Sequence, residues 1–407
     1  MILDIINKKR LGEELTKEEL DTFFSSYLKK KVKDYQMSSL LMAICINGMS
    51  EKEVFDLCDI FIKSGEVLDF SDIEGIKVDK HSTGGVGDKT TMVIAPIVAS
   101  LGVPVVKMSG RGLGYTGGTI DKLESIPGFR TDLSDSQLKE EVRKIGMAIT
   151  SQTSNLTPMD KAIYSLRDVS GTVESIPLIA TSIMSKKIAS GADKILIDIK
   201  LGCGALIKTK KDALRLSSLM IKIGKKYNKE VRTIITDMDN PLGRSIGNAI
   251  EVKEAMDVLL NREKGTFRNL CVEIASIMVS MGKNISMEEA KRKVNNSINN
   301  GLAFNKFLEF VAYQKGNIQK LKISDKTVDV ISTKNGVVKR IDALNFGKLS
   351  VKLGAGRKNK SDRINPQVGI RLNKLVGDKV KEGDVLCTIY VDKILNYDYV
   401  EDFYSIS

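Results

Sequence analysis

The residues best able to do chemistry lie first in a glycine-rich segment at positions 79–88, which reads DKHSTGGVGD. Glycines allow backbone N–H groups to approach an anion closely, and the helical pattern at 90–100 places a helix N-terminus beside them, which favours negative charge. Lys80 supplies a cation and Ser82 a hydroxyl donor. The segment therefore predicts a phosphate-binding loop, although glycine-rich loops before helices are common and this one lacks the ending of a Walker loop.

His81 is the single histidine among the 407 residues. A lone histidine is most often packed or solvated, but this one lies between Lys80 and Ser82 at the mouth of the loop. An imidazole there can donate a proton or a hydrogen bond near neutral pH. We therefore predict a role for His81 in the reaction.

A second glycine-rich segment at 107–124 reads KMSGRGLGYTGGTIDKLE and has five glycines within nine residues. Glycine loses much conformational freedom on folding, so such a cluster indicates an unusual backbone geometry or a close ligand. Ser109 and Thr119 add hydroxyl donors. Two loops of this kind in one α/β domain predict one pocket built from successive strand ends.

The segments that must position these loops alternate between strand and helix patterns. Apolar, β-branched runs at 103–108, 195–199 and 231–236 follow helical segments, which is typical of parallel strands joined by helices. A short apolar helix at 38–47 is expected to end at Gly48 in the left-handed conformation. Capping-box pairs mark the starts of three further helices: Thr16 with Glu19, Ser50 with Glu53, and Ser134 with Gln137.

Beyond about residue 328 the pattern changes to short alternating runs punctuated by glycines, which predicts a small β-rich domain. Its VGD and EGD turns resemble those of lipoyl or biotinyl carrier domains. No lysine lies at a hairpin tip between two of its strands, so we interpret this region as a structural module.

The composition sets limits on the class of protein. A chain of 407 residues with 42% hydrophobic and 28% charged residues fits two or three globular domains. Neither a signal peptide nor an apolar stretch of membrane-spanning length is present, so no membrane partner is expected. Five widely spaced cysteines without a CxxC pair indicate reduced thiols and a cytoplasmic location. The net charge of +12 is spread along a chain without Trp, which argues against nucleic-acid binding.

Residues 109–124 resemble the signature of the thymidine and pyrimidine-nucleoside phosphorylases. The segments 79–88 and 160–168, and Ser182 with Lys186, match that family in order and spacing, and the resemblance covers essentially the whole chain. It implies an α/β fold with a small all-α domain, a large α/β domain with a central, mostly parallel sheet, and a β-rich C-terminal region. The expected boundaries are 1–66 with 158–190 for the helical domain, 70–157 with 191–327 for the α/β domain, and 328–407 for the β-rich domain.

The resemblance also implies roles for individual residues. Phosphate would be held by Lys80, Ser82, Thr91, Ser109 and Thr119. The pyrimidine would be bound by Arg167, Ser182 and Lys186, with Leu113, Tyr164 and Ile183 as apolar walls and His81 near the 2-carbonyl oxygen or the ribose. Phosphate would attack the anomeric carbon of a pyrimidine nucleoside, and the charged groups of Arg167 and Lys186 would stabilise the departing base. No cofactor or covalent intermediate is required. The family forms homodimers through its helical domains, which implies the same here.

Three positions distinguish this chain within the family it resembles. Lys107 matches the branch with broad specificity, which predicts activity on uridine as well as thymidine and deoxyuridine. Tyr115 replaces a histidine common in the family, which leaves His81 alone. Lys89 stands where some relatives have a threonine beside a monovalent cation, so its ammonium either replaces that cation or points to solvent. The remaining cation positions would be Gly87, Leu242, Ser245 and Glu254.

Other charged residues near the motifs carry the less specific expectations. Arg111 is expected to pair with Asp121 or Glu124 and shape the second loop. The lysines expected to be solvated are Lys122, Lys161 and Lys187.

Three alternatives stay open at the level of sequence. A phosphorylase restricted to thymidine would share nearly all of these residues. A phosphoribosyltransferase of the anthranilate type resembles this fold, but it would need acidic residues for magnesium, and the set of Arg167, Ser182 and Lys186 argues against it. A basic nucleic-acid-binding or carrier protein is the non-enzymatic alternative.

Overall fold

The computed structural model describes residues 2–112, 115, 117–152, 155–359 and 361–407. The helices in these ranges are α1 (Ile2–Arg10), α2 (Lys17–Leu28), α3 (Asp34–Asn47), α4 (Glu51–Lys63), α5 (Thr90–Ser100), α6 (Thr119–Glu124), α7 (Asp135–Ile145), α8 (Pro158–Ser170), α9 (Ile176–Ala189), α10 (Lys210–Lys226), α11 (Ala249–Leu259), α12 (Thr266–Lys283), α13 (Met287–Asn299), α14 (Leu302–Tyr313) and α15 (Ala343–Leu353). The strands are β1 (Val78–Ser82), β2 (Val105–Ser109), β3 (Met147–Ser151), β4 (Lys194–Leu201), β5 (Glu230–Asp237), β6 (Ser245–Gly247), β7 (Thr327–Ile331), β8 (Gly336–Ile341), β9 (Gly369–Leu372), β10 (Lys379–Val380), β11 (Val385–Tyr390) and β12 (Tyr404–Ile406).

The chain divides into two compact units, and each is described by itself. The first unit comprises Met1–Asp72, Gln152–Ile197 and Thr209–Thr233. The second comprises Ile73–Ser151, Asp198–Lys208 and Ile234–Ser407, so β4 and β5 contribute residues to both. The predicted fold class, with an N-terminal helical bundle, an α/β domain and a β-rich C-terminal region, is confirmed. The three domain boundaries expected from the sequence stay a prediction.

Capping explains where the helices of the first unit begin. The Thr16 hydroxyl accepts a hydrogen bond from the Glu19 amide, and the Glu19 carboxylate accepts one from the Thr16 amide, as the capping box predicts. The short helix expected at 38–47 starts earlier, at Asp34, where the Gln36 side chain accepts a hydrogen bond from the Lys33 amide at 3.0 Å. Gly48 has a positive φ of 71° but a ψ of −166°, so the expected left-handed conformation is wrong in its ψ.

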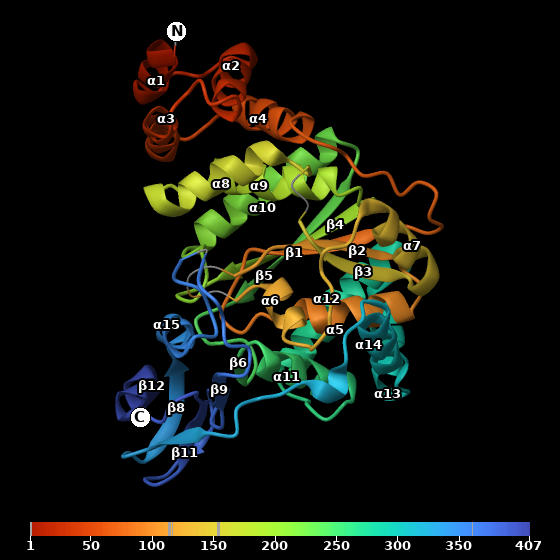
Figure 1. The fold of residues 1–407 in the computed structure, drawn as a ribbon, viewed down its shortest axis with the longest axis vertical. Coiled ribbons are helices and arrows are strands. Elements are labelled where there is room, and N and C mark those ends of the chain that lie inside the picture. Colours follow the sequence, from red (N-terminus) through yellow and green to blue (C-terminus); the bar gives the residue numbers. More distant parts are fainter. Residues whose placement is uncertain (1, 113–114, 116, 153–154, 360) are drawn as a thin grey trace. The chain divides into compact units, whose positions relative to one another are not determined.

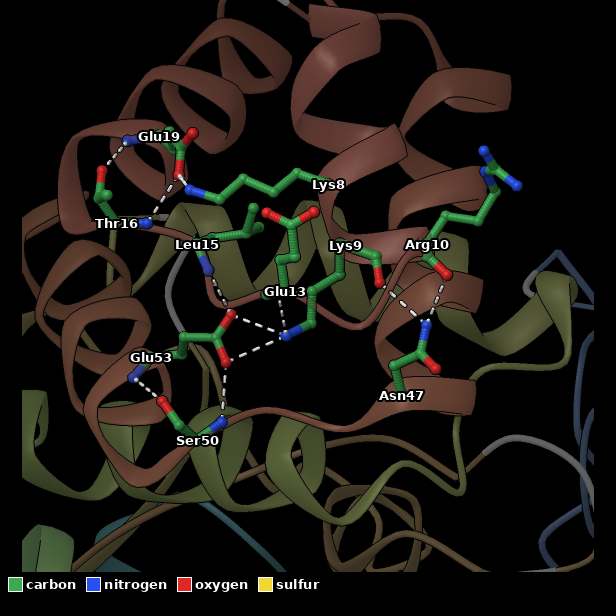
Figure 2. A network of polar contacts seen from close by, with 10 residues as sticks. All are labelled: Lys8, Lys9, Arg10, Glu13, Leu15, Thr16, Glu19, Asn47, Ser50 and Glu53. Carbon is green, nitrogen blue, oxygen red and sulfur yellow. Dashed lines mark hydrogen bonds and ion pairs between the residues drawn. The ribbon is translucent and has the colours of Figure 1, made fainter.

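Figure 2 shows how a buried carboxylate joins three of these elements. Glu53 of α4 and Lys9 of α1 are only 1% and 2% exposed, and the Lys9 Nζ lies 2.8 and 3.0 Å from the two carboxylate oxygens of Glu53. The same carboxylate accepts hydrogen bonds from the Leu15 amide and, as part of its capping box, from the Ser50 amide. An ion pair at this depth is tolerable because every carboxylate oxygen has a partner. The pair therefore fixes α1 and the loop before α2 against α4.

Helices α8, α9 and α10 lie beside one another in the first unit, drawn in yellow-green to green in Figure 1. Helix α9, with the sequence IPLIATSIMSKKIA, is apolar on nearly every side, and almost all of its residues are buried. Its Ser182, Ser185 and Lys186 are therefore polar groups set into an apolar helix, and such groups need specific partners.

Strands β1, β4 and β5 form a sheet in that order, and β2 pairs with β3 in parallel. β1 also lies against β2, with the Val78 amide donating to the Pro104 carbonyl at 3.2 Å. Helix α5 follows the first glycine-rich segment and is buried over almost its whole length, in keeping with its sequence TTMVIAPIVAS. Strand β1 ends at the first glycine-rich loop, and β2 ends at the second.

The C-terminal region, blue in Figure 1, contains two antiparallel sheets. The first has the order β10-β8-β12 and the second the order β6-β9-β11-β7, so β6 from the middle of the chain joins this region. Phe346 of α15 packs edge-on against Phe403 and Tyr404, in a core that also contains Val86 of the first glycine-rich segment. The β-rich region thus shares a core with one of the phosphate-type loops.

Among the described helices, none by itself is both long and apolar enough to cross a membrane. Only α12 and α13 together reach that length, and they meet at a bend of 117°.

Helix α7 carries a buried acid without an evident counter-charge. Glu141 is 1% exposed, and its Oε1 has no hydrogen-bond partner. Burial raises the pKa of this carboxyl from 4.5 to about 8, because the charged form is poorly solvated. The folded protein therefore binds this proton more tightly than the unfolded chain. The resulting stability is complete below the unfolded pKa and is lost as the pH rises through about 8.

Replacing Glu141 with glutamine is expected to flatten the pH dependence of unfolding. The wild type should lose roughly 3 to 5 kcal/mol between pH 5 and 9 through this group, and the variant should not. Denaturant unfolding at several pH values measures the difference. Glu140→Gln is the matched control, because Glu140 lies next door, is exposed and pairs with Lys144. Equal pH slopes for the Glu141 variant and the wild type would contradict the prediction.

Candidate active site

Lys80 lies in the middle of β1, with its ammonium buried among polar partners. The side chain is 1% exposed, and its Nζ lies 2.9 Å from Asp198 Oδ2 and donates to the Thr90 hydroxyl at 2.8 Å. Burial alone would lower the pKa of this ammonium, but the negative charges of Asp198 and Asp88 together outweigh that effect and raise it. Lys80 therefore stays charged. Because side chains alternate along a strand, Lys80 and Ser82 share one face of β1 and His81 lies on the other.

The first loop ends at Asp88, which organises the loop's donors. Its carboxylate accepts a hydrogen bond from the Ser82 hydroxyl. Burial alone would raise the pKa of this carboxyl, but neighbouring ammonium groups, Lys80 foremost and then Lys200, hold it well below its ordinary value. Ser82 also accepts from the Gly84 amide at 3.2 Å, which shapes the start of the loop. Two of the predicted phosphate ligands, Lys80 and Ser82, are thus held in place by the carboxylates of Asp198 and Asp88.

Asp198 and Lys200 belong to this charge network although the sequence analysis did not select them. Asp198 Oδ2 lies 2.8 Å from Lys200 Nζ, and its Oδ1 accepts from the Thr236 hydroxyl at 2.6 Å. Both charged side chains are fully buried. The signal that could have identified them is their presence in β4, which otherwise reads as a buried apolar strand, KILIDIKL. Charges in such a strand need partners, and here the Asp198 carboxylate contacts the ammonium groups of both Lys80 and Lys200.

The second loop closes on itself through Asp121. A Cβ added at Gly118 would lie 2.1 Å from the Gly112 amide nitrogen, so the two glycines approach back to back. The Gly112 amide donates to Asp121 Oδ2 at 2.7 Å. The prediction for Arg111 is confirmed, since it contacts Asp121 at 3.4 Å and Glu124 at 2.7 Å. Ser109 ends β2 and Thr119 begins α6, so both predicted phosphate ligands flank the closed loop.

Lys122 joins the two loops, and its expected exposure to solvent is wrong. Its side chain is fully buried, and its Nζ donates to the Asp88 carbonyl at 2.7 Å and lies 2.6 Å from Glu251 Oε2. Lys187 is also buried, at 2% exposure, whereas Lys161 is exposed as expected. Both lysines are buried because α6 and α9 pack closely against their neighbours, which the local sequence does not indicate. The Lys122 contact brings the end of the first loop to the helix that follows the second.

The other predicted residues of the second unit lie around these loops. Thr91 is buried in the first turn of α5, and His81 is partly exposed. Lys107 of β2 is 6% exposed, and its Nζ donates to the Lys80 carbonyl at 2.6 Å. Leu113 lies outside the described residues.

Lys89 is buried and bound by oxygen atoms. Its Nζ donates to the carbonyls of Leu242 and Ser245 at 2.5 and 2.9 Å, and lies 2.9 Å from Glu254 Oε2. The side chain is fully buried, which excludes the alternative that it points to solvent. The ring centroid of Phe267 lies 4.8 Å from the same ammonium. Two carbonyls and a carboxylate form the kind of oxygen shell that binds a monovalent cation, and here an ammonium fills it.

Glycines give this shell its close packing. A Cβ at Gly243 would lie 2.4 Å from Glu254 Oε1 and 2.9 Å from the Lys89 Nζ, and one at Gly87 would lie 2.8 Å from the Leu242 carbonyl oxygen. Because Lys89 already contacts all three oxygens, the residues present do not fit an additional cation at this point.

The predicted base-side residues lie on α8 and α9 of the first unit. Lys186 Nζ donates to Asp160 Oδ2 at 2.5 Å and to the Ser182 hydroxyl at 2.8 Å, and lies 5.6 Å from the ring centroid of Tyr164. Tyr164 is 46% exposed, whereas Ile183 is buried. The structure therefore brings Lys186, Ser182 and Tyr164 together.

Arg167 spans the connection between α8 and α9. It is 2% exposed, and three of its nitrogens donate to the carbonyls of Thr172, Leu178 and Val173 at 3.1, 3.2 and 2.7 Å. Burial lowers the pKa of the guanidinium. Much of its hydrogen-bonding capacity thus serves the turn, a structural task that the motif alone did not reveal.

Comparison with known proteins places this geometry in a family. Residues 3–65 match the helical bundle domain of a glycosyl transferase family and residues 74–304 its α/β domain, while residues 337–404 match the pyrimidine nucleoside phosphorylase C-terminal domain. The chain is 48% identical over 399 residues to the pyrimidine-nucleoside phosphorylases of Bacillus subtilis (strain 168) and Geobacillus stearothermophilus, covering 96% of this chain and 92% of each relative.

A solved structure supports the fold alone. The anthranilate phosphoribosyltransferase of Thermus thermophilus aligns with a TM-score of 0.60 at 16% identity, covering 77% of this chain and 100% of that one. The family matches above cover both the helical bundle and the α/β domain, and the α/β domain contains the two loops. The chain belongs to the pyrimidine-nucleoside phosphorylase family.

Proposed function

We propose that this enzyme cleaves uridine, thymidine and deoxyuridine with inorganic phosphate, which yields the free pyrimidine and ribose or deoxyribose 1-phosphate. The observation that carries the proposal is the connection of the two glycine-rich loops: Lys122 of α6 reaches the Asp88 carbonyl, and Lys80 and Ser82 lie on one face of β1. The names of the close relatives support the same reaction.

On this proposal, phosphate is bound by side chains whose charge is already balanced. The Lys80 ammonium has three N–H donors, and Asp198 and Thr90 engage two of them, which leaves one for phosphate. The hydroxyls of Thr91, Ser109 and Thr119 supply further donors, and Ser82 can turn its single hydroxyl proton from Asp88 to phosphate. Because the Asp198 carboxylate holds Lys80 before the substrate arrives, little reorganisation of this cation is needed when phosphate attacks the anomeric carbon.

The departing base would be stabilised by residues of α8 and α9. Arg167 has five N–H donors, of which backbone carbonyls engage three, and Lys186 keeps one beyond those to Asp160 and Ser182. Such donors stabilise the negative charge that develops on the pyrimidine as the glycosidic bond breaks. In our proposal Tyr164, Ile183 and Leu113 provide the apolar walls, and His81 lies near the 2-carbonyl oxygen or the ribose.

Lys107 supports the broad specificity in this proposal, because a cation on β2 beside Lys80 can bind the 2′-hydroxyl that only ribonucleosides carry. Replacing Lys107 with methionine is expected to lower kcat/KM for uridine roughly 10-fold, with that for thymidine nearly unchanged, since one hydrogen bond to a charged group is lost. Steady-state assays with both nucleosides measure the ratio. An unchanged ratio would show that Lys107 does not select the sugar.

We also propose that the Lys89 ammonium takes the place of a monovalent cation. Its contacts with Leu242, Ser245 and Glu254 are those that a potassium ion would make, and they connect the end of the first loop to β6 and α11. The enzyme should then need no added potassium. A cytoplasmic location, which its five free cysteines support, and a homodimer formed through the helical bundle complete the proposal.

One assay tests the reaction directly. Release of uracil from uridine and of thymine from thymidine is followed side by side, with and without phosphate and in the presence of EDTA. Phosphate-dependent release of both bases is expected. Release of thymine alone would indicate a thymidine-restricted enzyme. A requirement for magnesium and a pyrophosphate substrate would instead favour a phosphoribosyltransferase.

A further inference from the structure

Arg357, in the segment that follows α15, reaches the second glycine-rich loop. Its Nη1 lies 2.9 Å from both carboxylate oxygens of Asp121 and donates to the Gly112 carbonyl at 3.3 Å. These contacts join the C-terminal region to the loop that Ser109 and Thr119 flank. The side chain is 13% exposed, so the contact is largely shielded from water.

Asp121 needs this partner. Its carboxylate is 4% exposed and closes the loop by accepting from the Gly112 amide. Arg111 contacts the same carboxylate at 3.4 Å, but it is 49% exposed and its shorter bonds go to Glu124. Arg357 is therefore the closer and better shielded cation. Without it, a buried negative charge would stand beside a loop proposed to bind an anion.

The backbone around Arg357 is fixed in place. The Asn248 side chain donates to the Ala355 carbonyl at 2.7 Å, and the Asn365 amide donates to the Gly354 carbonyl at 2.8 Å. Earlier in the same region, a Cβ at Gly347 would lie 2.8 Å from the Tyr115 carbonyl oxygen, so α15 packs directly on the second loop. The guanidinium thus extends from a rigid base.

We infer that Arg357 is a positioning residue, through which the β-rich C-terminal region sets the conformation of the second loop for phosphate. The inference rests on the proposed phosphorylase function. Arg357 holds Asp121 and Gly112 in one arrangement, which orients the start of α6 and hence Thr119. It acts on phosphate through the loop, so its loss should affect phosphate more than the nucleoside.

Kinetics of Arg357→Gln and Arg357→Lys test the inference. The KM for phosphate should rise roughly 10- to 100-fold in the glutamine variant, because a displaced loop misplaces its ligands. The KM for uridine should stay within about twofold, and lysine, which restores the charge without the planar fork, should recover part of the loss. Arg363→Ala is the matched control, since Arg363 lies in the same segment but its side chain is exposed, unlike that of Arg357. An unchanged KM for phosphate, or an equal rise for both substrates, would overturn the inference.

A second measurement is independent of turnover. Hydrogen exchange of the peptide covering 109–124 should become about tenfold faster or more in Arg357→Gln, because the Gly112 amide loses its fixed acceptor. The rest of the second unit should exchange as in the wild type. Unchanged exchange in that peptide overturns the inference even if the wild type is active. An inactive wild type with the expected exchange would instead count against the proposed function alone.

Discussion

Replacing Lys80 with methionine is expected to lower kcat/KM for phosphorolysis by at least about 100-fold, the loss typical of one preorganised donor at a reacting group. Methionine keeps an unbranched apolar stem but removes the ammonium that lies 2.9 Å from Asp198. On the proposed function, phosphate would lose the ammonium that binds it. The loss should appear in the KM for phosphate as well as in kcat, and steady-state assays with varied phosphate separate the two.

The fold should survive this change, because Asp198 keeps Lys200 at 2.8 Å and the Thr236 hydroxyl. We expect a stability loss of about 1 to 3 kcal/mol. Lys77→Met, which removes another buried lysine just before β1, is the matched control and should stay active. A Lys80 variant with near wild-type kcat/KM would remove Lys80 from the phosphate site.

Truncating Lys89 to alanine is expected to make activity depend on added potassium or ammonium. The change opens a space bounded by the carbonyls of Leu242 and Ser245 and the carboxylate of Glu254. Without Lys89 the Glu254 carboxylate, 4% exposed, keeps hydrogen bonds from the Arg244 and Ser245 amides but loses its counter-charge, which destabilises the fold by up to about 3 to 5 kcal/mol. A small cation can fill the space and restore both thermal stability and activity, and its effect grows with its concentration.

Lys89→Met separates charge from space. Methionine fills the volume without a charge, so this variant should lose stability like the alanine variant but gain nothing from added salts. Sodium, potassium and ammonium chlorides at equal ionic strength distinguish specific binding from screening. Rescue of both variants alike, or none in the alanine variant, would contradict the prediction. A strict potassium requirement in the wild type would rule out the replacement itself.

Local features of the sequence determined much of the secondary structure. The capping boxes predicted at Thr16, Ser50 and Ser134 are present in the structure, because a capping box depends only on residues three positions apart. The strands at 195–199 and 231–236 appeared within β4 and β5, with ends one or two residues longer. The helix at 38–47 began at Asp34 instead, since its start depends on neighbours outside the apolar run.

The candidate site was foreseeable by residue type but only partly by role. Lys80 and Lys186 were selected because they stand in dense motifs, and both lie among polar partners. Arg167 was selected for its charge, yet most of its contacts are with backbone carbonyls of its own turn. Motif spacing identifies which residues are near a site, whereas their hydrogen bonds depend on where the chain passes next.

By itself, the sequence determined the fold class, the two glycine-rich loops and the family, because each rests on residues close together in the chain. The tertiary structure alone decided which charges are buried and what balances them. Lys122 meets Glu251, Lys89 meets Glu254 and Arg357 meets Asp121 across more than one hundred residues. A buried charge is tolerated only when packing brings its counter-charge to it, and no local pattern records that meeting.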